Sequence, residues 1–432
     1  MKISIHTLGC KVNQYESEAM LSILEKSGFQ RAHDGEISDI VIVNSCTVTA
    51  ASDAKVRQMF RRAKRSNPDA VMVLAGCLPQ AFADRIAEQF SDADIILGTK
   101  NRSALPKHIL DYLSSRQQIV DIIPHSQEES FEAMEVEGFG GRTRAFVKIE
   151  DGCNRFCSYC IIPYARGRVR SKPLDDIVRE VARLCSNGFS EIVLTGINLP
   201  AYGQDMGLGL CDAVEAVCKI SGVSRVRLSS LEPERMTAPD IARLSSLENF
   251  CPHFHLSLQS GCDETLKRMN RHYSAEDYRK IVHDLRAAFD NPGITTDIMV
   301  GFPGETEEEF TASLNFAKEI QFAKAHVFAY SRRPGTQAYD APDQVPNREK
   351  ERRSHDMISV TKASQTAFYK TQIGSEASVL FEQCVKSENN LYEGYTMNYT
   401  PVQMLSGENI QGKILRVKII NACESHCTAA LL

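Results

Sequence analysis

Apolar positions in the first hundred residues alternate between two spacings. Short runs rich in β-branched residues, typical of buried strands, occupy 2–9, 39–45 and 70–76. A stretch with helical spacing of its apolar residues follows each run. Strands that alternate with helices pair in parallel and are covered by helices on both faces. The pattern therefore predicts an N-terminal doubly wound α/β domain.

The alternation restarts at residue 143 with a second series of strand-like segments. Helical stretches such as 173–188 and 274–289 separate most of these segments, and a charged helix over 347–370 follows the last one. The strand-like segments are 144–150, 191–196, 224–230, 253–260, 294–301 and 325–331. Six β/α units of this size predict a partial (β/α)6 barrel, smaller than the eightfold form.

The two ends of this second series mark domain boundaries. Residues 117–141 contain no Lys or Arg and hold several Glu, which is typical of a surface linker. Beyond 372 the chain has short alternating runs separated by turn residues, which predicts a small β-barrel. The expected parts are an N-terminal domain over 1–120, an acidic linker over 121–142, a barrel domain over 143–371 and a small β-barrel over 372–432.

Composition narrows the setting of the protein. No run of apolar residues approaches the length of a membrane span, and the N-terminus lacks the apolar core of a signal peptide. Fourteen cysteines without a secretory signal favour a reducing compartment in which cysteines bind metals or fill cores. We therefore expect a cytoplasmic protein without a membrane partner.

Three cysteines in the segment "EDGCNRFCSYC" are the clearest chemical motif. Cys153, Cys157 and Cys160 have the spacing C-x3-C-x2-C and directly follow the first strand of the barrel domain. Ligands bind at the C-terminal ends of barrel strands, so this loop lies at the expected site. A closed zinc site takes four protein ligands and a cuboidal iron–sulfur cluster has four irons. Three thiolates leave one position open for chemistry.

Three further cysteines share a position that no spacing motif reveals. Cys10, Cys46 and Cys77 each lie just past the end of a predicted parallel strand of the N-terminal domain. The C-terminal ends of parallel strands meet at one edge of the sheet, where ligands bind. We therefore expect these cysteines to meet at a shared metal site. The alternative is three separate buried thiols.

The barrel loop resembles that of the radical S-adenosylmethionine enzymes. Together with "TLGCKVNQYESE", "NSCTVTASD", "AGCLPQ", "LSLQSGCDETLKRMNRHY" and "DIMVGFPGET", the whole chain is similar to the methylthiotransferase branch of that superfamily. The resemblance implies that the small β-barrel is TRAM-like. It also implies two [4Fe–4S] clusters, one on Cys153, Cys157 and Cys160, where S-adenosylmethionine binds the open iron, and one on Cys10, Cys46 and Cys77.

The resemblance also implies a reaction and a substrate. One S-adenosylmethionine methylates a sulfur at the N-terminal cluster, and a second yields a radical that removes the hydrogen at position 2 of an adenine, which the methylthio group replaces. Lys11, Val12, Asn13 and Gln14 resemble the enzymes that act on N6-threonylcarbamoyladenosine 37 in the tRNA anticodon loop. A reducing partner such as flavodoxin or ferredoxin is implied, whereas no residue indicates the sulfur donor.

Residues for the S-adenosylmethionine pocket follow from the matching motifs of the family. They lie after the second to fifth strands, where side chains and backbone face the cofactor. The expected residues are Gly196, Asn198, Ser229, Glu232, Gln259 and Gly301. Each has a structural alternative: a surface carboxylate for Glu232, a hydrogen-bonding residue inside the barrel for Gln259, and plain turns for the glycines. No catalytic residue beyond the cluster ligands is indicated.

Basic residues gather in two places although the net charge is −5. Residues 55–65 carry six basic side chains in eleven positions, and a second group follows the cysteine loop. If tRNA is the substrate, these groups would contact phosphates; otherwise they are solvated faces. The expected phosphate contacts are Arg61, Arg62, Arg166, Arg168 and Arg170.

Three alternatives remain open at this point. The first is a related methylthiotransferase that acts on isopentenyladenosine 37 of tRNA or on a ribosomal protein. The second is a non-catalytic iron–sulfur electron carrier or a tRNA-binding module. The third is a zinc protein.

Overall fold

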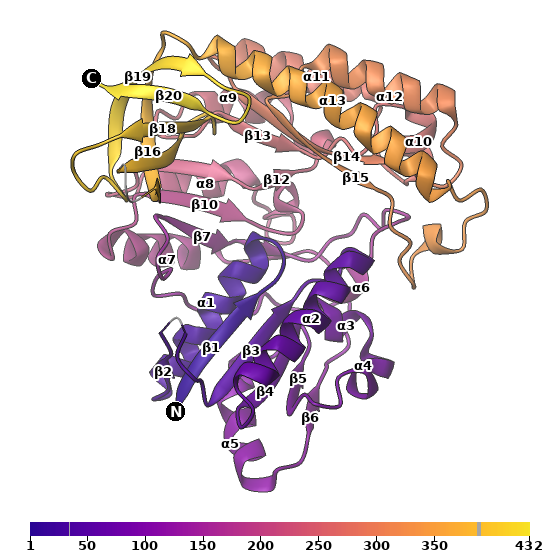
Figure 1. The fold of residues 1–432 in the computed structure, drawn as a ribbon, viewed down its shortest axis with the longest axis vertical. Helices are drawn as coiled ribbons and strands as arrows, with labels where there is room; N and C mark the ends of the chain where they lie inside the picture. Colours follow the sequence, from indigo (N-terminus) through magenta and orange to yellow (C-terminus); the bar gives the residue numbers. More distant parts are fainter. Residues whose placement is uncertain (34, 387–389) are drawn as a thin grey trace.

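The computed structural model describes residues 1–33, 35–386 and 390–432. Figure 1 shows the N-terminal sheet in the lower half of the molecule and the central strands and helices in the upper half. The C-terminal barrel packs beside the central part at the upper left. None of the helices in the described residues is both long and apolar enough to cross a membrane.

The N-terminal domain is a six-stranded sheet in which all neighbouring strands are parallel. The strand order is β2-β1-β3-β4-β5-β6, and the three predicted strands are β1, β3 and β4. The bounds are β1 Lys2–Thr7, β2 Gln30–Arg31, β3 Ile40–Ser45, β4 Val71–Gly76, β5 Ile95–Leu97 and β6 Ile119–Asp121.

Helices cover both faces of this sheet, as the double apolar pattern predicts. Met20 and Leu24 pack against one face, and Val56 and Phe60 pack against the other. The helices are α1 Lys11–Lys26, α2 Ala50–Ser66, α3 Cys77–Ala81, α4 Ala83–Gln89 and α5 Leu105–Ser115. The doubly wound arrangement is confirmed.

The central domain is an open, curved arrangement of parallel strands, which confirms the partial barrel. A break at Ser229 divides the third strand, so that β11 pairs with β10 and β12 pairs with β13. The bounds are β7 Arg144–Lys148, β10 Glu191–Thr195, β11 Arg225–Leu228, β12 Ser230–Leu231, β13 His253–Leu256, β14 Gly293–Val300 and β15 Lys324–Ala329.

Helices enclose these strands, and several begin at residues whose side chains cap them. Thr237, Ser274 and Thr306 each form a capping box with an acidic residue three positions later. The helices are α6 Ile162–Arg166, α7 Leu174–Ser186, α8 Leu210–Cys218, α9 Ala238–Ser245, α10 Asp263–Arg268, α11 Ala275–Ala288, α12 Glu307–Ile320 and α13 Asn347–Thr371.

The cysteine loop has a fixed base. The short strands β8 (Glu150–Asp151) and β9 (Arg170–Ser171) pair in antiparallel orientation and bring the two ends of the loop together. Gly152 has φ +87°, and a Cβ there would lie 2.0 Å from the carbonyl oxygen of Arg168. Glycine is therefore required where the loop leaves β8.

The C-terminal residues form the expected small barrel, which is closed by five strands in the order β16-β17-β18-β20-β19. Arginines of the central strands hold it in place: Arg225 donates to Ser378 Oγ (2.9 Å) and Arg227 to the carbonyl of Met397 (2.9 Å). The bounds are β16 Glu376–Lys386, β17 Leu391–Thr396, β18 Pro401–Leu405, β19 Ile414–Ala422 and β20 Cys427–Leu431.

The acidic segment 121–142 differs from the expected surface linker. Met134, Val136 and Phe139 are buried in the core of the central domain. Glu132 pairs with the buried Arg102 of the N-terminal domain (2.9 Å). The sequence predicted a surface linker because Glu residues dominate the composition of this segment. The apolar residues between them are too few to show a periodic spacing.

Candidate functional site

Cys10, Cys46 and Cys77 line one cavity of about 440 Å3. β1, β3 and β4 are neighbours in the sheet, and each cysteine follows the C-terminal end of its strand within three residues. Ile162 and Ile197 of the central domain also line the cavity. The structure thus brings the three cysteines together, as parallel pairing predicts, and faces them toward the central strand ends.

Two glycines make this approach possible. Gly9 has φ +136°, and a Cβ there would lie 2.8 Å from Cβ of Cys46. Gly76 has φ +101°, and a Cβ there would lie 2.5 Å from the carbonyl oxygen of Ser45. A larger residue at either position would push the strand ends apart.

Two of the three N-terminal thiols, Cys46 and Cys77, are buried, whereas Cys10 is exposed. Burial raises the pKa of the Cys77 thiol to about 12, although the guanidinium of Arg166 opposes this. Burial likewise raises the pKa of Cys46. Arg166 Nε donates to Cys77 Sγ at 3.2 Å. Thiols of this kind release their protons when they bind a metal, so metal binding and deprotonation are coupled here.

The C-x3-C-x2-C loop has a similar arrangement on the central domain. Burial raises the pKa of Cys153 to about 12 and also raises that of Cys160. Arg271 Nη1 donates to Cys157 Sγ at 3.3 Å. Arg271 is in turn paired with the carboxylate of Glu232. Each group of three cysteines therefore has one arginine that donates to a sulfur.

A buried ionic network joins the two domains between these cysteine groups. Glu16 on α1 is fully buried and pairs with Arg102 (3.1 Å), Lys148 (3.1 Å) and Arg166 (2.7 Å). Asp151 completes the network through Lys148 and Arg166, both at 3.1 Å. The network holds the N-terminal helix against the first strand of the central domain.

Neither cysteine group has the arrangement of a single-ion site in the described part of the chain. In a tetrahedral zinc site the sulfurs lie roughly 3.8 Å apart, because each Zn–S bond is about 2.3 Å. Across residues 1–33, 35–386 and 390–432, no three His, Cys, Asp or Glu side chains are arranged to hold one metal ion.

Three of the predicted cofactor residues carry buried polar atoms that lack a partner in the described part of the chain. These atoms are Asn198 Oδ1, Ser229 Oγ and Gln259 Oε1. Gln259 also has φ +64°, a backbone conformation that costs energy for a residue with a side chain. Unpaired buried polar atoms at neighbouring strand ends fit a polar ligand such as S-adenosylmethionine.

The predicted glycines have structural tasks that the sequence did not reveal. A Cβ on Gly196 would lie 2.5 Å from Glu150 Oε2, so the glycine makes room for that buried carboxyl group. A Cβ on Gly301 would lie 2.4 Å from Cγ of Lys350, and its N–H donates to Glu305 (2.6 Å). The space beside Gly301 is therefore filled by the side chain of Lys350.

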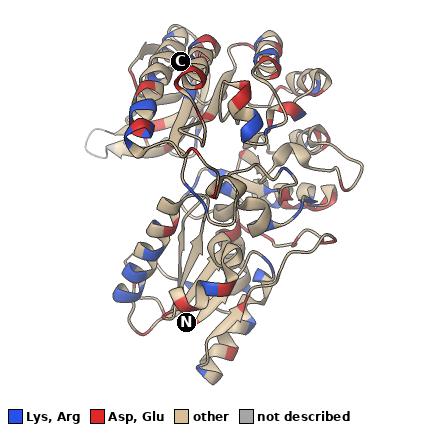
Figure 2. Cartoon of the chain, turned by 90° about the vertical axis from the view of Figure 1, so that its right-hand side faces the viewer, with Lys and Arg blue, Asp and Glu red and all other residues tan. Residues whose placement is uncertain are grey.

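The basic residues divide into buried and exposed groups, which corrects part of the prediction. Arg166 is fully buried and Arg170 is 6% exposed, so neither is placed to contact a phosphate. Arg166 instead serves the ionic network and Cys77. Arg61, Arg62 and Arg168 are exposed, and Figure 2 shows Lys and Arg spread along one exposed helix, α2.

Sequence reasoning missed Glu16, Arg271 and Glu150. Burial raises the pKa of Glu150 well above its ordinary value, and its Oε1 lacks a partner in the described residues. The N–H of Asn198 donates to Glu150 Oε2 at 2.7 Å. Glu150 lies three residues before Cys153 and Glu16 six residues after Cys10, which was the only signal in the sequence, because a charged side chain is usually exposed.

Two family models match this chain. The model described as "Uncharacterized protein family UPF0004" matches residues 2–98, and the "Radical SAM superfamily" model matches residues 147–317. The first region contains the N-terminal cysteines and the second contains the C-x3-C-x2-C loop. The two models thus cover the two cysteine sites separately.

Curated relatives match nearly the whole chain. "Threonylcarbamoyladenosine tRNA methylthiotransferase MtaB" of Bacillus subtilis is 38% identical, with 97% of this chain and 94% of the relative covered. The protein of the same name from Thermotoga maritima is 37% identical, with 97% and 95% covered. "tRNA-2-methylthio-N(6)-dimethylallyladenosine synthase" of Pelotomaculum thermopropionicum is 34% identical, with 100% and 97% covered.

Among solved structures, the chain resembles the radical S-adenosylmethionine methyltransferase TsrM from Kitasatospora setae. With tryptophan and a cofactor analogue bound, that structure matches at a TM-score of 0.58 and 15% identity, with 78% of this chain and 75% of that chain covered. At this identity the match shows the fold alone.

Proposed function

We propose, because this chain belongs to the family of radical S-adenosylmethionine tRNA methylthiotransferases, that it transfers a methylthio group to position 2 of the adenine in N6-threonylcarbamoyladenosine 37 of tRNA. The reaction uses two [4Fe–4S] clusters and two molecules of S-adenosylmethionine. A reducing partner such as flavodoxin or ferredoxin supplies electrons.

The two cysteine groups divide the work. Cys153, Cys157 and Cys160 hold the cluster that binds S-adenosylmethionine, and Cys10, Cys46 and Cys77 hold the cluster for the inserted sulfur. When bound, the clusters and the cofactor supply the radical chemistry. Ile162 and Ile197 of the central domain line the N-terminal cavity, so a target base between the two groups would be shielded from water.

The polar atoms of Asn198, Ser229 and Gln259 hold the cofactor. Each lacks a partner in the described residues, so hydrogen bonds to a ligand remove the cost of their burial. Arg271 and Arg166 donate to cysteine sulfurs, which stabilises negative charge on the two sets of thiolates.

The surroundings of Lys11 support threonylcarbamoyladenosine as the substrate. The pKa of Lys11 is lowered, and burial is the largest cause. The guanidinium groups of Arg144 and Arg227 lower it further, whereas the phenol of Tyr399 opposes the shift. The nearby carboxylate of Asp297 is already paired with His255 (3.3 Å). A basic group beside Cys10 favours a substrate with a negative charge. The threonylcarbamoyl group carries a carboxylate, whereas the isopentenyl group is apolar.

The test is an anaerobic reaction of the reconstituted protein with tRNA that carries either modification at position 37. Mass spectrometry of the nucleosides should show 2-methylthio product from threonylcarbamoyladenosine. Lys11→Gln should lower that product more than Lys11→Arg does. Product from isopentenyladenosine alone would overturn the choice of substrate.

A second candidate is the same transfer to isopentenyladenosine 37. It is favoured by the relatives named as dimethylallyladenosine synthases, which match at 34–35% identity. The same reaction with both tRNAs decides between the two substrates. Formation of 5′-deoxyadenosine from S-adenosylmethionine and a reductant separates both candidates from a non-catalytic electron carrier.

A further inference from the structure

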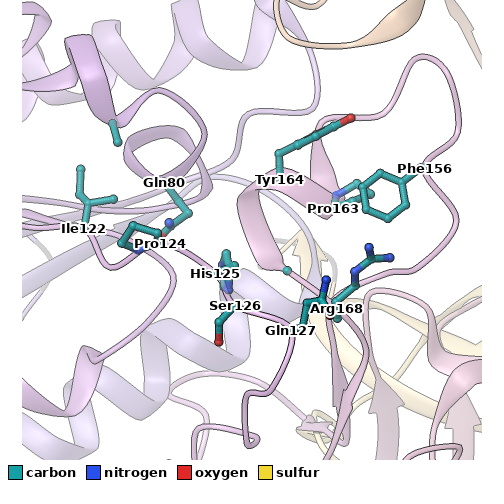
Figure 3. Close-up of a pocket in the computed structure, with 12 residues that line it drawn as sticks. Gln80, Ile122, Pro124, His125, Ser126, Gln127, Phe156, Pro163, Tyr164 and Arg168 are labelled. Carbon is teal, nitrogen blue, oxygen red and sulfur yellow. The ribbon is translucent and has the colours of Figure 1, made fainter.

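A second cavity lies beside the cysteine loop, with a volume of about 460 Å3. Phe156, immediately before Cys157, and Tyr164, four residues after Cys160, come from the loop and from α6. Figure 3 shows Phe156, Pro163, Tyr164 and Arg168 on one side of the cavity and Gln80, Pro124, His125 and Ser126 on the other. The volume is suited to a ligand of nucleoside size.

The first side of the cavity is built from flat groups. The guanidinium of Arg168 lies over the ring of Phe156, 4.6 Å from its centroid. Tyr164 meets the same ring edge-on, with centroids 5.7 Å apart and an angle of 83° between the planes. Tyr164 is nonetheless 49% exposed. An exposed aromatic ring beside a stacked arginine is the surface on which unpaired bases stack.

The opposite side is held rigid by its own hydrogen bonds. His125 Nδ1 pairs with Glu129 (2.8 Å), and its Nε2 bonds to Thr99 Oγ1 (3.0 Å). Gln80 Oε1 accepts from the N–H of Thr99 (2.9 Å). Ser126 and Gln127 are exposed at the rim. The cavity is therefore preformed, with a stacking wall, a fixed wall and polar groups at the edge.

We propose that this cavity binds an unstacked nucleobase of the anticodon loop adjacent to the target adenosine, stacked on Tyr164 and the Arg168–Phe156 pair. The proposal rests on the proposed function, in which tRNA is the substrate. A base that leaves a folded loop for a buried site loses its stacking, and its neighbour loses one stacking partner as well. An aromatic and guanidinium surface next to the cysteine loop replaces that stacking.

The experiment measures binding of an anticodon stem-loop RNA to the reconstituted holoprotein by fluorescence anisotropy. Tyr164→Ala and Arg168→Ala should each weaken binding about tenfold, because each removes one flat group on which the base stacks. Tyr164→Phe keeps the ring and should bind as the wild type does. Arg168→Lys keeps the charge but loses the flat group, so its affinity should fall between those of the wild type and Arg168→Ala.

A matched control lies far from the site. Arg116 also stacks on an aromatic ring, with its guanidinium 5.7 Å from the centroid of Tyr112, at the end of α5. Arg116→Ala removes the same charge and the same kind of stack, and it should leave RNA binding unchanged. Iron content and circular dichroism show whether each variant has folded.

A second measurement changes the RNA as well as the protein. Stem-loops with an abasic residue at each loop position are compared on the wild type and on Tyr164→Ala. One abasic position next to the target should weaken the wild type about tenfold and Tyr164→Ala little further. Equal losses in both proteins at every position would overturn the base pocket. Methylthio product formed normally by Tyr164→Ala, with normal RNA affinity, would also overturn it while leaving the proposed function intact.

Discussion

The N-terminal and central cysteine sites have the same components but are assembled from different parts of the chain. Each has three cysteines and one arginine that donates to a sulfur, at 3.2 Å from Arg166 to Cys77 and at 3.3 Å from Arg271 to Cys157. The central cysteines come from one loop of eight residues, whereas each N-terminal cysteine follows the end of a different strand.

The difference shows in what holds each arginine. Arg271 pairs with Glu232, and both residues belong to the central domain. Arg166 also belongs to the central domain, but it reaches Glu16 and Cys77 of the N-terminal domain and is fully buried between them. The loop site is therefore assembled within one domain, while the strand-end site depends on docking of the two domains.

The largest expected effect separates the two sites by activity. Cys160→Ala should reduce 5′-deoxyadenosine formation to background, because the cluster that binds S-adenosylmethionine loses a ligand. Cys77→Ala should lose about half of the roughly eight irons per chain and still cleave the cofactor. Iron analysis and chromatography of 5′-deoxyadenosine measure both. Loss of cleavage in a folded Cys77→Ala protein would contradict this division of work.

The next effect concerns the domain interface. Arg166→Met should lower the free energy of unfolding by about 3–5 kcal/mol, since it leaves Glu16 and Asp151 buried with fewer cations. Arg271→Met should cost less, because Glu232 is partly exposed and regains water. Denaturant unfolding followed by circular dichroism gives both values. The double variant Glu16→Gln/Arg166→Met should recover part of the loss, and equal losses in the two single variants would remove the contrast.

The two sites also differ in how acid affects them. Burial raises the pKa of Glu16, but Arg102, Arg166 and Lys148 outweigh it and hold the pKa at about 2, below the ordinary 4.5. The stability that this group contributes is present above pH 4.5 and is lost as the pH falls from 4.5 to 2. Its size is about 3 kcal/mol for a shift of this order.

Glu150, beside the central site, has the opposite sign. Its pKa is raised by burial, so its contribution is present below pH 4.5 and is lost as the pH rises above that value. Glu150→Gln should therefore stabilise the protein at pH 8, whereas Glu16→Gln should destabilise it and flatten the acid limb. Unfolding curves from pH 3 to 8 measure both, and the same sign for the two variants would contradict the assignment.

The smallest expected effect concerns the exposed arginines of α2 and of the segment after the cysteine loop, and their contribution to tRNA binding. Arg61→Ala and Arg62→Ala should each weaken tRNA binding a few-fold and lower the slope of log K against log salt by about 0.9 per lost phosphate contact. Arg168→Ala should weaken binding more, because it also loses stacking. Arg179→Ala, exposed on α7, is the control. An unchanged salt slope would remove α2 from the tRNA surface.

Strands and the meeting of the N-terminal cysteines were predictable from the chain alone. The β-branched runs before Cys10, Cys46 and Cys77 alternate with helices, and that order forces parallel pairing. Parallel pairing places the C-terminal ends of strands on one edge of the sheet. The order of strands and helices in the sequence was therefore enough to predict that the three cysteines lie close together. The spacing of Cys153, Cys157 and Cys160 needed no fold at all, because one loop carries all three.

The sequence did not determine which charged side chains are buried and which are exposed. Arg166 and Arg168 look alike in the segment "ARGRVR", yet one is buried against Glu16 and the other is exposed over Phe156. Likewise, the Glu residues of 121–142 concealed Phe139, which packs in the core. The buried role depends on a partner 150 residues away in sequence, and no local pattern records it.

The sequence by itself thus determined the elements, their order and the six cysteines, because backbone periodicity and thiol spacing are local properties. Only the tertiary structure decided which charges face each other between the domains and which aromatic rings line the cavity beside the loop. A charged side chain is buried only where a partner repays its desolvation, and the folded chain alone brings such partners together.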